Sequence, residues 1–576
     1  MSGEFEIDFT HYHDHEELTK ILRRLVQSFP NLARLTSEGE SPQGREFWLM
    51  KITNYETGSP EDKPAMWIDA NTHSSEVTGC EVALYTAWYL LKEYGRSPFV
   101  TELLDDKAVY VYPRVDPDGA ELFLTSPYHR TGGARHYPLS EEEWMEEDGL
   151  YPDDVNGDGE ITTMRVRDPM GDWRVSELDP RIMVKRGADE KGSTYYRKYT
   201  EGLIRNYDGG EVSMAPPMMG LNLNREWPAN WAPHPIQQGA GPYPISQPET
   251  RALADAWYKY GNLGGIMTYH THSGAILRPF NQASDDEFGK NDCERDLATY
   301  KALGAIGEKI TNYPLVSIWH DFLIDKLHPR HGNSKDWWYM HWGVFVYCIE
   351  LWSLERKAGL GGFKERGFEA SREHSEEQEL ALLKLNDEEL GGEGFMGWTP
   401  FDHPQLGSVE IGGWRTKFTM RNPPPKWLME EIERTYMFAL KLAEALPLLR
   451  FGDVITTPVG DGVFTVKAVV ENRGFLPTNV SEQAKKMGVA RTVKACITPG
   501  DGVELVSGKN RVDLGHIEGR SDRLPGFPFY GASGGKAEET AKTVRWTVKA
   551  EKTPANVEIV IKSQKAGTLK RSLTLQ

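Results

Sequence analysis

Apolar residues recur at three- and four-residue steps in several segments, which predicts helices with one face turned to a core. The clearest of these segments are residues 16–29, 76–94 and 427–447. Short apolar runs lie between such segments and predict strands, as in "AMWIDA" at 65–70 and "AVYVYPRV" at 108–115. This alternation of strands and helices predicts an α/β domain with a mixed central sheet.

The pattern changes beyond about residue 451. Stretches such as "GVFTVKAVVENRG" and "KTVRWTVKA" alternate apolar and polar positions between Gly, Pro and Asn turns, which predicts a small all-β sandwich over residues 451–576. The preceding domain, residues 1–450, is interrupted at about 120–219 and 353–425 by segments rich in glycine, proline and charge. We expect these two insertions to lie over one face, where loops commonly tune function.

Composition narrows the classes of function. The net charge is −19, which argues against binding nucleic acid through phosphate neutralisation. No apolar run approaches the ~20 residues of a membrane span, so we expect no membrane association. The four cysteines form no C-x-x-C pair, so a cysteine-ligated zinc site is not indicated. The start, "MSGEFEIDFT", has no features of a signal peptide, and we expect a cytoplasmic protein, or a secreted one if a signal was removed.

Candidate metal ligands follow two of the predicted strands. His73 and Glu76 come three positions apart in "DANTHSSEVTG", just after the strand at 65–70. A polar turn that caps the next helix would explain them, and so would half of a metal site. A catalytic zinc ion takes three protein ligands, and the third should end another strand. The run "GGIMTYHTH" offers His270, directly after its apolar residues, with His272 as the alternative.

A candidate general base ends a further strand. The segment "WGVFVYCIELWS" is strongly apolar and carries Glu350 into apolar surroundings. A carboxylate in that position is costly unless it is paired or functional. Water activation beside a metal ion needs such a base.

With these residues in place, the chain resembles the zinc carboxypeptidase A/B family. The similar segments occur in order over residues 5–450, and none is specific alone. They are "GESPQGREFWLMKI", "NTHSSE", "PRVDPDGAE", "GLNLNREW", "GPYPISQPET", "HTHSGAILRP" and "GNSKDWWYMHWGVFVYCIEL". The chain has Asp116 where the family usually has Asn, and Gln247 where it has Glu.

The resemblance implies a carboxypeptidase-like three-layer fold and a set of roles. His73, Glu76 and His270 match the family's ligands for one zinc ion, and Glu350 matches its general base. Asn224 and Arg225 match the pair that holds the terminal carboxylate of the substrate, a contact that suits the planar guanidinium.

Three further roles are less fixed by the resemblance. The family polarises the scissile carbonyl with an upstream arginine, for which we favour Arg165, with Arg130 and Arg167 as alternatives. Lys335 matches the base of the pocket for the terminal side chain and predicts a preference for C-terminal Glu or Asp, unless it points away or Asp336 neutralises it. His328 stands where the family has a mobile tyrosine and is a candidate substrate contact.

Two further features of the sequence concern metal binding. Asn222 replaces an aspartate that commonly orients the first zinc histidine, so we expect weaker support there. The stretch "DDVNGDGEITTM" resembles the start of a calcium loop, although its twelfth position is Arg165 instead of Glu. Either it is a plain Asp/Gly turn, or it holds calcium through Asp154, Asn156, Asp158 and Glu160.

The resemblance predicts a zinc metallocarboxypeptidase that removes one residue from peptide or protein C-termini. Two alternatives stay open. One is an amidase on the same scaffold that cuts γ-glutamyl or cell-wall peptide bonds. The other is a binding protein without catalysis, in which the insertions and the β tail recognise a partner.

Overall fold

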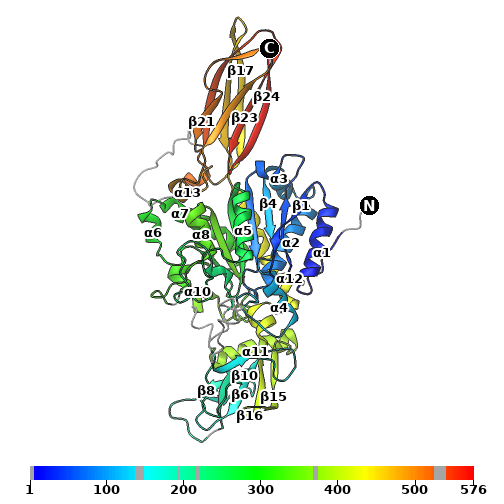
Figure 1. The fold of residues 1–576 in the computed structure, drawn as a ribbon, viewed down its shortest axis with the longest axis vertical. Coiled ribbons are helices and arrows are strands. Elements are labelled where there is room, and N and C mark those ends of the chain that lie inside the picture. The colour runs from blue at the N-terminus through cyan, green and yellow to red at the C-terminus, as the bar shows by residue number, and fades with distance from the viewer. Residues whose placement is uncertain are drawn as a thin grey trace.

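The computed structural model describes residues 5–130, 132–135, 148–192, 194–215, 220–323, 325–366, 374–523 and 540–576. Three parts follow one another along the long axis of the molecule (Figure 1). A central α/β domain lies in the middle, an all-β domain with the C-terminus lies at one end, and a smaller sheet with α11 (Glu376–Leu390) lies at the other.

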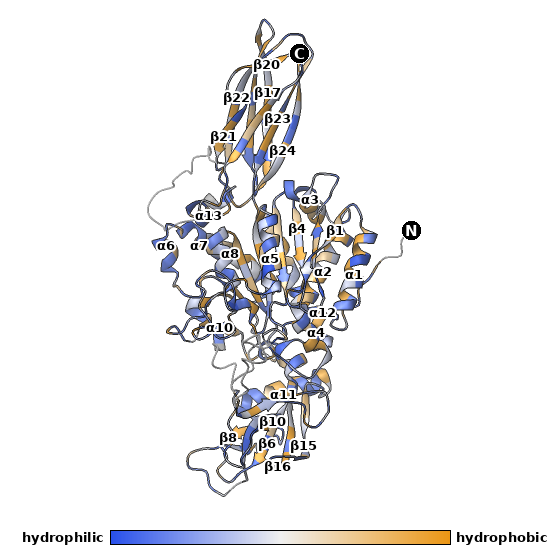
Figure 2. Ribbon diagram, in the orientation of Figure 1, coloured by the Kyte–Doolittle hydropathy of each residue, from blue (hydrophilic) through white to orange (hydrophobic). Residues whose placement is uncertain are grey.

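An eight-stranded mixed sheet forms the centre of the molecule, in the order β1-β2-β4-β3-β11-β14-β12-β13. Its four central strands, β4, β3, β11 and β14, are parallel and nearly all their residues are buried, as expected for strands covered on both faces. Figure 2 shows the hydrophobic colouring concentrated along these strands. The strands are β1 (Ala33–Glu40), β2 (Glu46–Ile52), β3 (Ala65–Ala70), β4 (Ala108–Tyr112), β11 (Leu263–Thr271), β12 (Ala275–Arg278), β13 (Leu315–Ser317) and β14 (Phe345–Leu351).

Helices cover both faces of this sheet. On one face, α2 (Thr78–Glu93) packs so tightly that Gly79 has no room for a side chain against Tyr269 and Ala70. On the opposite face, Trp67 of β3 contacts Trp257 of α5 (Pro248–Lys259), with ring centroids 5.7 Å apart. The remaining helices of this domain are α1 (His15–Ser28), α3 (Pro98–Asp106), α4 (Pro117–Thr125), α6 (Asp286–Lys290), α7 (Glu294–Thr311), α8 (Ser334–Trp342), α9 (Leu354–Lys357), α10 (Phe363–Arg366) and α12 (Pro425–Ala445).

The two predicted insertions contribute to one shared sheet. Strand β16, from the second insertion, pairs with β6 from the first, with Glu410 opposite Arg165. The sheet runs β15-β16-β6-β9-β7-β8, and a separate ladder joins β10 to β5. These strands are β5 (Gly149–Pro152), β6 (Thr163–Arg167), β7 (Trp173–Val175), β8 (Met183–Lys185), β9 (Tyr195–Thr200), β10 (Gly202–Arg205), β15 (Phe395–His403) and β16 (Gly407–Trp414). A small core of its own, which includes Leu150, Met164 and Ile411, holds this part together.

The all-β domain consists of two four-stranded sheets, β17-β18-β22-β20 and β21-β19-β23-β24. Alternate residues of β18 are buried, which is the pattern of a strand with one face on a core. Its elements are β17 (Leu449–Gly460), β18 (Val463–Asn472), α13 (Glu482–Lys486), β19 (Val493–Pro499), β20 (Val503–Ser507), β21 (Arg511–Gly515), β22 (Ala541–Ala550), β23 (Ala555–Ser563) and β24 (Gly567–Leu575).

The predicted fold class is confirmed: an α/β domain with a mixed central sheet flanked by helices, followed by all-β sheets. The helices predicted at 16–29, 76–94 and 427–447 are α1, α2 and α12, each displaced by at most two residues at either end. None of the helices in the described part of the chain is both long enough and apolar enough to cross a bilayer.

Candidate metal centre and active-site cleft

His73 and Glu76 lie in the turn between β3 and α2. Asn71 adopts a left-handed φ of 56°, and its Nδ2 donates to the His73 carbonyl oxygen at 2.7 Å. The Glu76 amide donates to the same oxygen at 3.1 Å. The N-cap of α2 is Val77, without a side-chain cap bond, so the two polar residues are not there to cap the helix. The turn instead holds both side chains at the carboxyl edge of the sheet.

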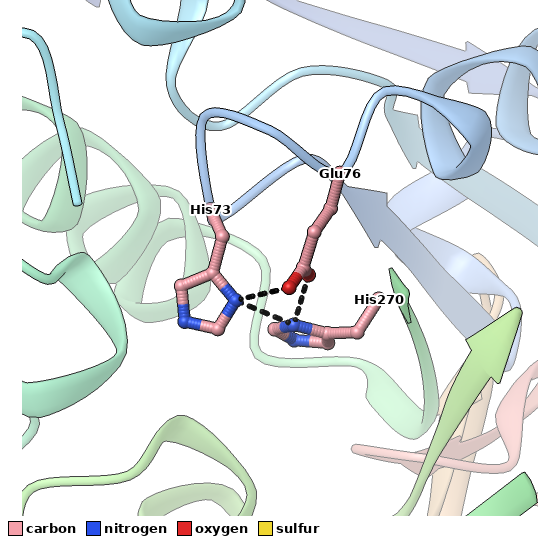
Figure 3. Close-up of side chains that lie close together, drawn as sticks. All are labelled: His73, Glu76 and His270. Carbon is pink, nitrogen blue, oxygen red and sulfur yellow. Dashed lines mark hydrogen bonds and ion pairs between the residues drawn. The ribbon is translucent and has the colours of Figure 1, made fainter. Parts of the chain in front are cut away.

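His270 reaches the same point from the neighbouring strand. β11 is parallel to β3, with Tyr269 paired to Ala70, so the next residue emerges beside the β3–α2 turn. Figure 3 shows the three side chains converging. Nδ1 of His73 lies 3.0 Å from Oε1 of Glu76, and Nδ1 of His270 lies 2.8 Å from its Oε2. The two Nδ1 atoms are 3.1 Å apart.

These atoms fit a zinc ion. The three donor atoms lie within 4.8 Å of one another, and no other such group of His, Cys, Asp and Glu occurs among the residues that the structure describes. Ligand atoms about 2.0–2.1 Å from a tetrahedral zinc ion are separated by about 3.3 Å, close to the spacing seen here. Two imidazole nitrogens and a carboxylate that face one point form the N/O set that zinc favours.

The charges of the three groups suit this assignment. Burial lowers the pKa of His270, which favours the neutral ring that binds metals. Burial alone would raise the pKa of Glu76, but the two histidines hold it well below its usual range. The outer nitrogens, Nε2 of His73 and Nε2 of His270, are buried and have no hydrogen-bond partner in the described structure. Asn222 does not support His73, because its side-chain oxygen accepts from the Asn224 amide at 2.9 Å.

Glu350 stands beside this group at the end of β14. β14 is parallel to β11, and Glu350 pairs with His270 in the ladder. Burial and the negative charge of Glu76 raise the pKa of Glu350 to about 7, although the positive charges of His270 and Lys335 oppose the shift. A carboxyl group poised near neutrality is suited to proton transfer.

Asn224 and Arg225 lie in a short 3-10 turn, Leu223–Arg225. Ser334 donates to Oδ1 of Asn224 from its amide at 3.0 Å and from its hydroxyl at 3.1 Å, which leaves the amide nitrogen as a donor. Arg225 lines the cleft. Burial, reinforced by the charge of Arg330, lowers the pKa of Arg225 to about 9. An anion beside Arg225 would stabilise the charged guanidinium and so counteract the effects of burial and of Arg330.

Lys335 and His328 occupy different surroundings. Lys335 is buried in the first turn of α8, close enough to Glu350 for its charge to lower the pKa of that carboxyl. The neighbouring Asp336 accepts from the Asn281 amide at 3.0 Å. His328 is exposed on a loop that lines the cleft, and its Nδ1 lies 2.6 Å from Asp325.

The prediction of Arg165 as the carbonyl-polarising residue is corrected by the structure. Arg165 lies in β6, where its Nε and Nη2 donate to Glu410 at 3.0 and 3.2 Å. Its guanidinium also lies over Trp398, and it is not among the residues that line the cleft. The alternative Arg167 is exposed on the same strand, whereas Arg130 does line the cleft.

A second arginine near the triad had no signal in the sequence. Arg421 ends the π-helical turn Thr416–Arg421, within the second insertion, and its Nη1 lies 3.8 Å from Oε1 of Glu76. No motif marks this position, because only the tertiary fold brings a residue so distant in sequence to the β3–α2 turn. The alternative ligand His272 also lines the cleft, and burial together with Arg421 lowers its pKa to about 4.

The candidate calcium residues do not group as ligands. The Asp154 carboxylate accepts from the amides of Gly157, Asp158 and Gly159. Nδ2 of Asn156 donates to Asp158 at 2.7 Å, and Glu160 pairs with Arg415 at 2.7 Å. These are the contacts of a plain Asp/Gly turn, and the calcium prediction gains no support from them.

A large cleft with a volume of about 1460 Å³ is lined by His73, Glu76 and Glu350. Its walls come from the central domain and from both insertions. Among the described residues that line it, the arginines outnumber the acidic residues. The arginines are Arg130, Arg225, Arg330 and Arg421, and the acids are Glu76, Asp153 and Glu350.

Comparisons with known proteins agree with this site. A family model described as zinc carboxypeptidase matches residues 18–368, and one described as a domain of unknown function (DUF8731) matches residues 448–574. Carboxypeptidase A2 of Mus musculus is 24% identical over 366 residues, 62% of this chain and 65% of that protein. Carboxypeptidase D of Mus musculus is 31% identical over 121 residues, but these make up 21% of this chain and 9% of that protein.

Solved structures are similar at lower identity. The crystal structure of thrombin activatable fibrinolysis inhibitor aligns with a TM-score of 0.38 and 18% identity, over 60% of this chain and 67% of that one. The chain thus spans two thirds or less of these proteins, and less than a tenth of the mouse carboxypeptidase D. The zinc carboxypeptidase model nevertheless covers more than half of the 576 residues and includes all four residues of the metal centre and its base. The chain belongs to the zinc carboxypeptidase family.

Proposed function

We propose that this protein is a metallocarboxypeptidase that hydrolyses the last peptide bond of a substrate and releases one C-terminal amino acid. Family membership supports a metal-dependent peptide hydrolase. The observation that carries the proposal is the meeting of His73, Glu76, His270 and Glu350 at the ends of three neighbouring parallel strands. Zinc held by the first three residues would polarise a carbonyl group and lower the pKa of water to near 7.

The protein's own residues carry out the remaining proton transfers of the reaction. Glu350 takes a proton from water as the water oxygen adds to the scissile carbonyl carbon. The carbon–nitrogen bond then breaks, and Glu350 returns the proton to the leaving amine. One water molecule is consumed, and the products are a shortened peptide and a free amino acid.

Two groups position the substrate. Arg225, with the amide nitrogen of Asn224, binds the terminal carboxylate, which restricts cleavage to the end of a chain. Arg130 takes the carbonyl-polarising role first considered for Arg165, because it lines the cleft while Arg165 is committed to Glu410. His328 contacts the substrate from the facing loop.

We further propose a preference for acidic terminal residues. Lys335 is buried in the first turn of α8, and its positive charge lowers the pKa of Glu350. With zinc bound, the charges of Glu76 and Glu350 would be balanced, and the arginines among the described cleft residues would remain in excess over Asp153 and one substrate carboxylate. A second carboxylate on the terminal residue would complement this excess of positive charge.

The test combines metal analysis with peptide hydrolysis. The purified protein should contain one zinc ion per chain, and Glu350→Gln should keep the zinc but lower kcat by about 10³-fold or more. Peptides that differ only in a C-terminal Glu, Phe or Lys should be cleaved fastest with Glu, and Lys335→Met should abolish that preference. Equal or faster cleavage of Phe by the unaltered enzyme would reject the acidic preference alone.

The same experiment separates the alternatives. A protein with stoichiometric zinc that ignores free α-carboxyl peptides but cuts γ-glutamyl or cell-wall peptides would be an amidase. A protein without zinc and without hydrolysis would be a binding protein. Either result would overturn the proposed carboxypeptidase activity.

A further inference from the structure

We propose that the first insertion forms an apolar binding wall for the substrate residues on the amino side of the scissile bond. This inference rests on the proposed function and extends it from the terminal residue to the residues that precede it. The wall is defined here as Leu203 and Met214, with Ile161 buried behind them; all three line the cleft.

Exposed apolar side chains gather at this cleft. Leu203 is 39% exposed and Met214 is 50% exposed, both on the insertion. The same cleft is lined by Ile236, which is 70% exposed, and Leu327, which is 87% exposed, on two loops of the central domain. Single exposed leucines are ordinary on protein surfaces, but several large apolar side chains around one cleft are typical of a binding surface.

The apolar residues that the first insertion contributes lie on or beside hydrogen-bonded strands. Leu203 lies in β10 and pairs with Tyr151 of β5, which itself lines the cleft. Met214 lies beside the same strand, bridged to Leu150, which is fully buried in the core of the insertion. The wall is therefore held in position by a small core and is not a free loop.

The position proposed for the terminal residue of the substrate sets the direction in which the rest of the peptide runs. Arg225, Lys335 and Asn224 belong to the central domain, and they bind the terminal residue in the proposed function. The preceding residues must leave through the cleft toward the insertion. The volume of about 1460 Å³ exceeds the range of about 300–1,000 Å³ typical of small-ligand sites, so several residues fit.

The chemistry of the wall selects apolar side chains. Among the described residues of the first insertion that line the cleft, Asp153 is the only acidic one. Covering Leu203 and Met214 with an apolar side chain removes apolar surface from water on both partners, which stabilises the complex. The occupant is thus an extended peptide with large apolar residues just before its C-terminal residue.

The experiment compares peptides that share one C-terminal residue and carry either Leu or Ser at the second to fourth positions from that end. The unaltered enzyme should cleave the Leu peptides with a kcat/KM about tenfold higher. Leu203→Ser and Met214→Gln should each reduce this ratio several-fold, while kcat/KM stays unchanged for an N-blocked dipeptide whose residue before the C-terminal one is glycine and has no side chain to contact the wall. Because both side chains are partly exposed, we expect both variants to fold, as thermal unfolding would verify.

Leu178→Ser is the matched control, because Leu178 lies in the same insertion, is 66% exposed and does not line the cleft. It should leave the ratio unchanged. Equal cleavage of Leu and Ser peptides, or a ratio unaffected in both wall variants, would overturn the inference while leaving the proposed function in place. No hydrolysis of any peptide would instead refute the proposed function.

Discussion

At the scale of single residues, two arginines from the same segment of the sequence have different structural roles. Arg130 and Arg165 both lie in the segment where the sequence predicted a carbonyl-polarising arginine. Arg130 lines the cleft, while Arg165 pairs with Glu410 and stacks on Trp398. Their surroundings predict opposite effects on substitution.

We expect Arg130→Ala to lower kcat by about 10²-fold or more, since it removes a charge that stabilises the developing oxyanion. Arg165→Ala should instead lower the free energy of unfolding by about 1–3 kcal/mol, because Glu410 loses its partner, and should leave kcat near its original value. Steady-state kinetics and denaturant unfolding of both variants test the assignment. A large loss of kcat in Arg165→Ala with intact Arg130→Ala would reverse it.

Part of this site could be predicted from the sequence, and part of it could not. His73, Glu76, His270 and Glu350 each follow a buried apolar strand, and parallel strands end at one edge of a sheet, so local patterns indicated their meeting point. Arg421 lay beyond prediction because its approach to Glu76 depends on how an insertion folds back. Leu203 and Met214 look like any surface apolar residue until the cleft is seen.

At the scale of elements, a buried histidine of the second insertion links helix α11 to helix α9. Nδ1 of His374 lies 2.8 Å from Glu379 of α11, and its Nε2 lies 3.3 Å from Glu355 of α9. Glu379 also accepts from the Trp414 indole of β16 at 2.9 Å. Burial opposes the charged form of His374, but the hydrogen bonds with the two glutamates raise its pKa to about 9.

This arrangement predicts a stability that depends on pH. The folded-state pKa of His374 is above the unfolded value of 6.5, so its contribution is fully present below pH 6.5 and is lost as pH rises through about 9. We expect His374→Gln to destabilise the protein by about 2 kcal/mol at pH 6 and by much less at pH 10. Denaturant unfolding at both pH values tests this, and an equal loss at both would contradict it.

The strands of the insertions show why sequence patterns did not reveal their partners. β6 and β16 each have a recognisable extended sequence, but Arg165 and Glu410 are 245 positions apart. Local hydrophobic spacing gives the face of a strand and contains no information about a partner so distant. The two insertions, predicted only to lie over one face, contribute strands to one shared sheet.

At the scale of the whole molecule, the all-β domain contacts the central domain away from the cleft. Oδ1 of Asp296 on α7 accepts from the Glu482 amide at 2.9 Å, and its Oδ2 accepts from the Gln483 amide at 3.0 Å and from the Tyr339 hydroxyl at 2.9 Å. Lys565 donates to the carbonyl oxygen of Leu263, at the start of β11, whereas His270 lies near the other end of that strand.

We therefore expect Asp296→Ala to loosen the junction of the two domains without changing catalysis. The backbone amides that begin α13 and the Tyr339 hydroxyl would lose their acceptor, at a cost of about 2–3 kcal/mol. Calorimetry should show the unfolding of the all-β domain moving to lower temperature, with kcat/KM unchanged at 25 °C. Asp513→Ala, which removes an exposed partner of Lys494, is the control and should have little effect. A loss of activity in Asp296→Ala would contradict the separation of junction and site.

The pairing of β6 with β16 also has a consequence for the order in which the molecule is made. During synthesis, β6 is made more than two hundred residues before its partner β16, and Arg421 is made after β16. A nascent chain that already contains His73, Glu76, His270 and Glu350 still has an open sheet edge and an unfinished cleft. The ribosome therefore delivers the metal ligands and Glu350 before β16 and Arg421, which complete the sheet edge and the cleft.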